Sequence, residues 1–168
     1  MKKVLLSAVS AALIATSSFA LDTTGIHTSV GLAYQSVTDA DSGMALVVNV
    51  GKDFNNLQLG QGKLGIEGEV TRSIVKPSIY NIDLTITTFA VYATYKYNFS
   101  SNLYLKPRLG ILHESVSVDN SSYDGTDTGL SYGIALGYDI NNNISAYIDW
   151  TKIESDVSNL TIGASYSF

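Results

Sequence analysis

Several charged residues in this chain are spaced two positions apart, a spacing that suits ion pairing inside a closed sheet. Glu67 and Glu69 form one acidic pair, and Lys106 and Arg108 form a basic pair. Residues two apart on a β-strand point to the same side. Acids and bases on neighbouring strands of a closed sheet can therefore meet in its interior, where charges must be paired. We expect such a lumenal network from Glu67, Glu69, Lys96, Lys106, Arg108, Asp139 and Asp149.

The two histidines do not complete a recognisable catalytic set. His27 lies on a face of small residues, His113 falls on the opposite phase of its own segment, and neither has a serine and an aspartate at a known spacing. The stretch 60–62 lacks the strand-to-helix context of a phosphate loop. The acidic stretch 119–127 matches no calcium loop. We therefore expect no enzymatic activity, no cofactor and no metal.

The N-terminal twenty residues predict a cleaved signal peptide. Lys2 and Lys3 form a short positive region, and residues 4–14 are mostly apolar but too short to span a bilayer as a helix. Small residues at Ser18 and Ala20 occupy the positions that a signal peptidase reads. We predict that cleavage leaves residues 21–168 as a single domain.

The composition of the chain favours β structure. It is rich in Tyr, Val, Ile, Thr and Gly, has two prolines and has no cysteine. A small secreted chain without disulfides needs either a good core or a lipid solvent that forces its hydrogen bonds to close. The formal charge is −5 and becomes −7 when the two leader lysines are removed, which argues against a nucleic-acid partner.

Alternation of apolar and polar residues with a period of two is the main signal after the leader. In the clearest segment, Leu130, Tyr132 and Ile134 alternate with Ser131 and Gly133. Eight segments show this pattern, at about residues 25–35, 43–54, 63–73, 83–99, 103–118, 128–140, 144–154 and 157–168.

The connections between these segments are of two kinds. Asn-rich turns follow Phe or Ile at Asn55-Asn56, Ser100-Ser101-Asn102 and Asn141-Asn142-Asn143, and the first of them extends to about Gly62. We predict that these turns face the periplasm. The remaining connections, at 36–42, 75–82, 119–127 and 155–156, are predicted to be extracellular loops, and they are acidic.

The two faces of the segments favour a membrane over water. One face carries Leu, Ile, Val or aromatic residues, and the other carries residues mostly too small to cover a soluble surface well. A soluble barrel would turn its apolar face inward. Because an open sheet edge in lipid leaves backbone groups unpaired, an even number of hairpin-linked strands must close on itself. The sequence predicts an all-β fold, an eight-stranded antiparallel up-and-down transmembrane β-barrel.

The whole mature chain resembles the small outer-membrane barrels of the OmpA transmembrane-domain and OmpX type. The leader, the eight segments, the turn at 137–143 and the ending Gly-Ala-Ser-Tyr-Ser-Phe at 163–168 carry this resemblance. It implies an outer-membrane location, a lumen filled by charged side chains and a C-terminal signal that the barrel-assembly machinery recognises. In this chain Tyr166 and Phe168 would form that signal.

The function expected from these features is a non-enzymatic outer-membrane barrel that contributes to envelope integrity or surface properties. Eight strands leave an interior just wide enough for side chains, which favours a plugged lumen. One alternative is a small gated pore whose ion pairs exchange partners. Another is a surface adhesin or immune-evasion protein whose extracellular loops bind a host or surface ligand.

Two cations on the apolar face lie near predicted extracellular ends. Arg72 and Lys152 are candidates to contact lipopolysaccharide phosphates in the outer leaflet. The alternative is that their long side chains only snorkel to the interface, which is favoured for Lys152.

Overall fold

The computed structural model describes residues 24–38, 40–79, 82–118, 124–153 and 157–168. The predicted leader, most of the loop at 119–127 and the loop at 155–156 lie outside these residues. The described residues hold no helix that is long and apolar enough to cross a membrane.

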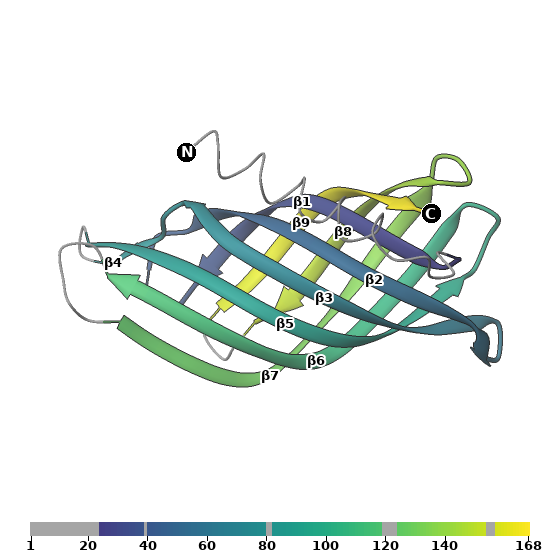
Figure 1. The fold of residues 1–168 in the computed structure, drawn as a ribbon. Coiled ribbons are helices and arrows are strands. Elements are labelled where there is room, and N and C mark those ends of the chain that lie inside the picture. The colour runs from purple at the N-terminus through teal and green to yellow at the C-terminus, as the bar shows by residue number, and fades with distance from the viewer. Residues whose placement is uncertain (1–23, 39, 80–81, 119–123, 154–156) are drawn as a thin grey trace.

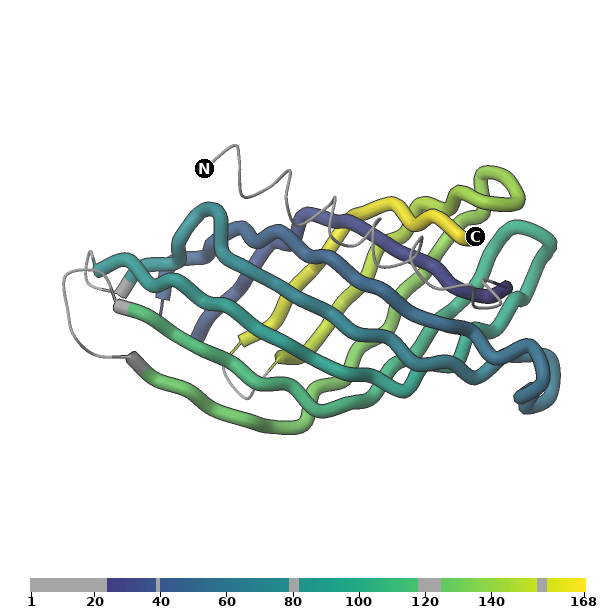
Figure 2. Tube along the Cα trace, in the orientation of Figure 1, coloured from purple at the N-terminus to yellow at the C-terminus, as the bar shows by residue number. Residues whose placement is uncertain are grey.

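The described residues form a closed antiparallel barrel of eight long strands (Figures 1 and 2). Each long strand pairs with its neighbours along the chain, and pairing of β1 with β9 and of β3 with β5 completes the ring. The two-residue β4 pairs only with the start of β5. The strand bounds are β1 Ile26–Val37, β2 Gly43–Leu59, β3 Gly62–Val75, β4 Ser78–Ile79, β5 Ile82–Asn98, β6 Leu103–Val118, β7 Asp124–Asp139, β8 Ile144–Lys152 and β9 Val157–Ser167. The predicted fold class is confirmed.

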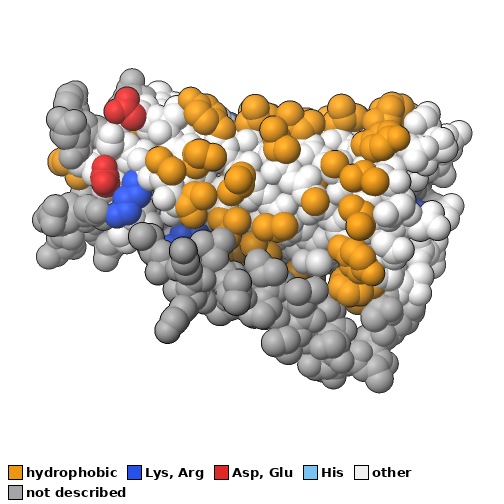
Figure 3. All heavy atoms as spheres, turned by 90° about the horizontal axis from the view of Figure 1, so that it is seen from above, with side chains coloured by type: hydrophobic (Ala, Val, Ile, Leu, Met, Phe, Trp, Pro, Cys, Tyr) orange, Lys and Arg blue, Asp and Glu red, His pale blue; other side chains and the backbone are white. Residues whose placement is uncertain are grey.

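The outer face of the barrel is apolar over most of its height. Large hydrophobic side chains there are strongly exposed, for example 58 % at Leu109, 67 % at Ile162 and 72 % at Leu130. They cover much of the side seen in Figure 3, and charged side chains gather toward one end of that view. Burying polar rather than apolar side chains would be unfavourable in water, but it suits a lipid solvent around the barrel.

Three predicted connections differ from the structure. Asn55-Asn56 lies inside β2, which continues to Leu59 past a register shift between Asp53 and Gln58. The chain reverses at Gly60, whose φ of 64° lies in the left-handed region that glycine adopts without strain. On the extracellular side, β7 begins at Asp124 rather than at residue 128, and the predicted loop 75–82 contains β4.

The assignment of one apolar and one polar face to every strand is also wrong near the extracellular end. In β5 the outward Phe89 and Val91 are apolar, whereas beyond Thr88 the apolar Leu84 and Ile86 take the inward positions. In β6 the change falls at Leu112, which points inward and is fully buried. Strands that leave the membrane meet water on their outer face, so the apolar residues move to the inner face.

Glycines make room for the tyrosines that fill the lumen. Tyr104 faces Gly137 across the β6–β7 ladder, and a Cβ on this glycine would lie 2.0 Å from the tyrosine ring. Tyr147 and Gly163 are related in the same way across β8 and β9. Inward rings therefore lie flat over neighbouring strands and fill an interior that eight strands leave narrow.

Candidate functional site

Arg108 stands at the centre of the candidate site because its cross-strand neighbours are small. In β6 it lies opposite Thr94 of β5 and Gly133 of β7, so its long side chain is free to cross the lumen. Lys106 lies two residues earlier on the same strand, so its side chain points to the same side. The acids reach the lumen from β3 and β8, which lie two strands away from β6 on either side of it.

The guanidinium of Arg108 binds three carboxylates. Its Nη1 donates to Glu67 Oε1 at 3.2 Å and to Glu69 Oε2 at 2.6 Å, and its Nη2 donates to Asp149 Oδ1 at 2.8 Å. Nη2 also donates to Thr151 Oγ1. Lys106 Nζ donates to Glu67 Oε2 at 2.5 Å. Five of the seven residues expected in a lumenal network are thus joined through one arginine.

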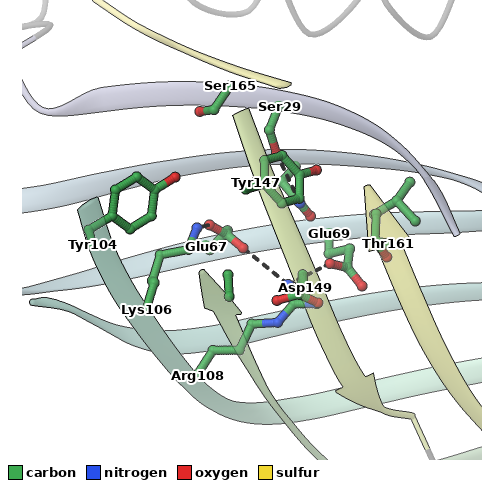
Figure 4. A pocket seen from close by; sticks show the side chains of 13 residues that line it. Ser29, Glu67, Glu69, Tyr104, Lys106, Arg108, Tyr147, Asp149, Thr161 and Ser165 are labelled. Carbon is green, nitrogen blue, oxygen red and sulfur yellow. Dashed lines mark hydrogen bonds and ion pairs between the residues drawn. The ribbon is translucent and has the colours of Figure 1, made fainter. Parts of the chain in front are cut away.

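This network is buried. The side chains of Arg108, Glu67, Glu69 and Asp149 are 3 %, 1 %, 2 % and 5 % exposed. Figure 4 shows them converging from different strands on one small pocket, together with Lys106 and Tyr147. Charges taken this far from water are costly unless each has a partner, so the members hold one another in place.

Tyr92 separates the charged layer from an apolar layer on its extracellular side. The Arg108 guanidinium lies 4.4 Å from the centre of the Tyr92 ring, and the Tyr92 hydroxyl is 2.9 Å from Ser131 Oγ. Tyr92 also belongs to a buried cluster with Ala90, Leu112, Ile153 and Val157. The lumen is therefore filled by two successive layers of side chains, one ionic and one apolar.

The other two expected members form a separate pair at the periplasmic end. Lys96 Nζ lies 3.9 Å from Asp139 Oδ1 and 4.0 Å from the centre of the Tyr104 ring. Ser145 Oγ donates to the same aspartate oxygen at 2.6 Å. Both charged side chains are partly exposed, so this pair contributes less to stability than the Arg108 network.

The structure keeps Arg72 and Lys152 apart. Arg72 is on β3 and Lys152 is on β8, with three long strands between them in either direction round the ring. They cannot form one phosphate clamp. Lys152 lies beside Tyr132, which packs edge-to-face with Trp150. Any lipid contact would involve two separate sites.

Tyr166 and Phe168 lie together on the outer face at the periplasmic end. Their rings meet edge-to-face with centroids 5.0 Å apart, and both side chains are exposed. Their role as an assembly signal stays a prediction.

The histidines fall on opposite sides of the wall. His27 points into the lumen, with its Nε2 3.2 Å from Glu67 Oε2, while His113 is exposed on the outer face beside Thr128. Among the described residues, no group of three His, Cys, Asp or Glu side chains could hold a metal ion.

Sequence reasoning missed Tyr92, Thr151 and His27 as partners of the network. All three share the inward phase with the charged residues, so alternation alone could have placed them in the lumen. The choice of partner across the lumen depends on strand tilt and register, which alternation does not specify.

A match to a family model establishes how this chain is related to known proteins. Residues 4–168 match the model of the outer membrane protein beta-barrel domain. The chain belongs to this family. Its place is therefore the outer membrane of a Gram-negative envelope, with lipid around the barrel. No curated protein sequence matches the chain.

Several solved structures share the fold. Ail of Yersinia pestis, solved in complex with the heparin analogue sucrose octasulfate, has 20 % identity and a TM-score of 0.64, over 86 % of this chain and 99 % of Ail. Neisserial surface protein A has 17 % identity and a TM-score of 0.57, over 86 % and 98 %. The outer membrane enzyme PagL has 14 % identity and a TM-score of 0.51, over 83 % and 99 %. These identities show the fold alone.

Proposed function

We propose that the protein is a non-enzymatic structural barrel that contributes to the integrity of the outer membrane. The observation that carries this proposal is the filled lumen, in which Arg108 holds three carboxylates that are at most 5 % exposed. Among the described residues, side chains that pair with one another in this way fill the lumen, and a filled lumen disfavours a substrate site or a continuous water path inside it. The function would then lie in the outer wall of the barrel, which forms a rigid body among the lipids of the outer membrane.

Contacts with lipopolysaccharide belong to this proposal. Arg72 is exposed on the outer face, and Lys152 is half-buried beside exposed aromatic rings. A cation in this position can bind a lipid phosphate while the rings contact acyl chains. Each residue would hold its own lipid, because the two lie on separate parts of the wall.

The proposal is tested in a strain that lacks the protein. We expect the deletion strain to admit a large hydrophobic antibiotic more readily than the parent, and the wild-type chain to restore the barrier. The double variant Arg72→Ala/Lys152→Ala should restore it less and should retain less lipopolysaccharide on purification. Lys52→Ala, a cation near the periplasmic end, serves as the matched control. An unchanged barrier in the deletion strain would refute the envelope role, and unchanged lipid retention would refute the two contacts.

The likeness to Ail does not by itself favour binding of a polyanion. Sucrose octasulfate is strongly negative, whereas this chain has a formal charge of −5 and exposes Asp41, Asp83 and Asp127 near its extracellular end. Like charges repel across an interface. A surface ligand of this chain would need a different chemistry.

A further inference from the structure

The hairpin between β2 and β3 continues beyond the end of β1 (lower right in Figure 1). β2 pairs with β1 only as far as Lys52, yet it runs on to Leu59 before the chain returns into β3 at Gly62. We call residues 54–64 the periplasmic hairpin. Among the described residues, β3 is the only strand that pairs with the β2 half of this hairpin.

The two faces of the periplasmic hairpin differ in polarity. Leu59 is the cross-strand partner of Gly62, which takes the outward phase of β3, so Leu59 lies on the outer face. Leu57 lies two residues earlier and shares this face. The opposite face carries Gln58 and its cross-strand partner Lys63. The hairpin is therefore amphipathic, with its apolar side turned away from the barrel axis.

The apolar side of the hairpin is exposed and continuous with the lipid-facing wall. Leu57 and Leu59 are 50 % and 64 % exposed. Leu64 and Ile66, which follow on the outward phase of β3, are 38 % and 48 % exposed. Gly62 is the only other outward residue of β3 between Leu59 and Ile66. No polar side chain on this phase of β3 therefore separates the leucines from the wall that contacts lipid.

Tyr95 holds the hairpin in place from the outer face of β5. Its hydroxyl donates to the Leu59 carbonyl oxygen at 2.6 Å. A Cβ at Gly62 would overlap the Tyr95 ring, so the glycine lets the ring lie directly over β3. Rings with an apolar body and a polar edge are typical of the boundary between membrane and water. The exposed leucines thus lie beside a side chain suited to that boundary.

The backbone of the hairpin limits how deeply it can lie in lipid. Among the described residues, β2 has no strand partner on the β1 side beyond Asp53. An unpaired sheet edge is costly among acyl chains, whereas the hydrated headgroup region can satisfy its backbone groups. The boundary between headgroups and acyl chains accommodates both the exposed leucines and this edge.

The size of the apolar surface favours lipid over a protein partner. Leu57, Leu59 and Leu64 offer only a fraction of the roughly 1,000 Å² that a stable protein interface buries. Insertion into a membrane interface requires no such minimum, because each apolar side chain contributes by its own burial.

We propose that the periplasmic hairpin inserts Leu57 and Leu59 into the inner leaflet of the outer membrane, at the boundary between phospholipid headgroups and acyl chains. The hairpin tip then rests on the membrane surface instead of projecting into the periplasm. This contact fixes the depth and tilt of the barrel on its β2–β3 side. It depends on the membrane location of the barrel and not on the envelope role.

The test uses the mature chain, which has no cysteine of its own, so that a single introduced cysteine can carry a label. Leu57→Cys and Leu59→Cys are labelled separately with the fluorophore nitrobenzoxadiazole. Each is refolded into vesicles of phosphatidylethanolamine and phosphatidylglycerol that contain nitroxide-labelled lipid. We expect emission at a shorter wavelength than in water. A nitroxide near the headgroup should quench it more strongly than one near the end of the acyl chain.

Three labelled positions serve as matched controls. Gln58→Cys, on the polar face of the same hairpin, should be quenched weakly by both lipids. Ser101→Cys, in the turn between β5 and β6, should show the emission of a label in water. Val91→Cys, exposed on the outer face of β5, should be quenched most by the deeper nitroxide. Retention of the gel shift between unheated and boiled samples shows that each variant is folded.

Three outcomes would overturn the proposal. Emission at Leu57 and Leu59 equal to that at Ser101 would show that the hairpin projects into water. A shorter emission wavelength without quenching by either lipid would show that protein, and not lipid, covers the leucines. Strongest quenching by the deeper nitroxide, as at Val91, would place the hairpin among the acyl chains and remove its interfacial role.

Discussion

Replacing Arg108 with methionine is expected to lower the free energy of unfolding by about 3–5 kcal/mol. The substitution keeps most of the apolar volume but leaves Glu67, Glu69 and Asp149 without their shared cation. Three carboxylates that lie close together out of water then repel one another and lose hydrogen bonds. Urea unfolding in phosphatidylcholine vesicles measures the effect through the fluorescence of Trp150, the single tryptophan.

Two further variants make this prediction specific. Lys152→Met removes a cation from the outer wall and should change stability by no more than about 0.5 kcal/mol. The triple variant Arg108→Met/Glu69→Gln/Asp149→Asn removes the cation together with two of its acids and should recover much of the loss. A loss for Arg108→Met no larger than that for Lys152→Met would show that the buried network does not hold the lumen together.

Gly110→Ala is expected to destabilise the barrel by about 1–3 kcal/mol, as overpacking does. A Cβ at this position would lie 2.0 Å from the Val91 carbonyl oxygen and 2.8 Å from Tyr92 Cα. Both atoms belong to the backbone of β5, so no side-chain rotation can make room. The β5–β6 ladder must shift, and with it the position of Tyr92 over Arg108.

Gly68→Ala is the matched control for this substitution. Its Cβ would meet only the Val50 carbonyl oxygen, at 3.8 Å, which is an ordinary contact. We expect it to change stability little, and the same urea titration compares the two variants. Equal effects of the two substitutions would mean that the close approach at Gly110 does not set the cost.

The number and order of the eight long strands could be predicted because period-two alternation persists through most of the chain. The segment at 103–118 was placed at the observed bounds of β6. Closure followed from physics, since lipid does not tolerate an open sheet edge. The first turn could not be placed from Asn55-Asn56, because a register shift carries β2 past these residues to Gly60.

The inversion of faces escaped prediction for a different reason. Alternation shows that Leu112 and Ile111 lie on opposite faces of the strand. Because both residues are apolar, the pattern no longer distinguishes the inner face from the outer face where the strand leaves the membrane. Only the three-dimensional packing shows that Leu112 belongs to a buried cluster with Ile153 and Val157 inside the lumen. The start of β7 was missed because Asp124 to Asp127 carry a polar pattern typical of a loop.

The members of the candidate site could be predicted from the sequence, but their pairing partners could not. Phase alone placed the charged residues in the lumen, and the structure joins five of them through Arg108. The separation of Lys96 and Asp139 into their own pair depends on their depth along the barrel axis. Strand tilt sets this depth, and no local pattern encodes it.

The central claim is that side chains block the lumen of this barrel. The conductance of the purified, refolded protein in a planar lipid bilayer tests this claim most directly. We expect no unitary current steps from the wild type once the gel shift has confirmed folding. Arg108→Met should also stay silent, because the apolar layer of Leu112, Ile153 and Val157 still blocks the lumen. Stable, reproducible unitary steps from the wild type would contradict the closed lumen and would make the protein a channel with Arg108 and Glu69 in its gate.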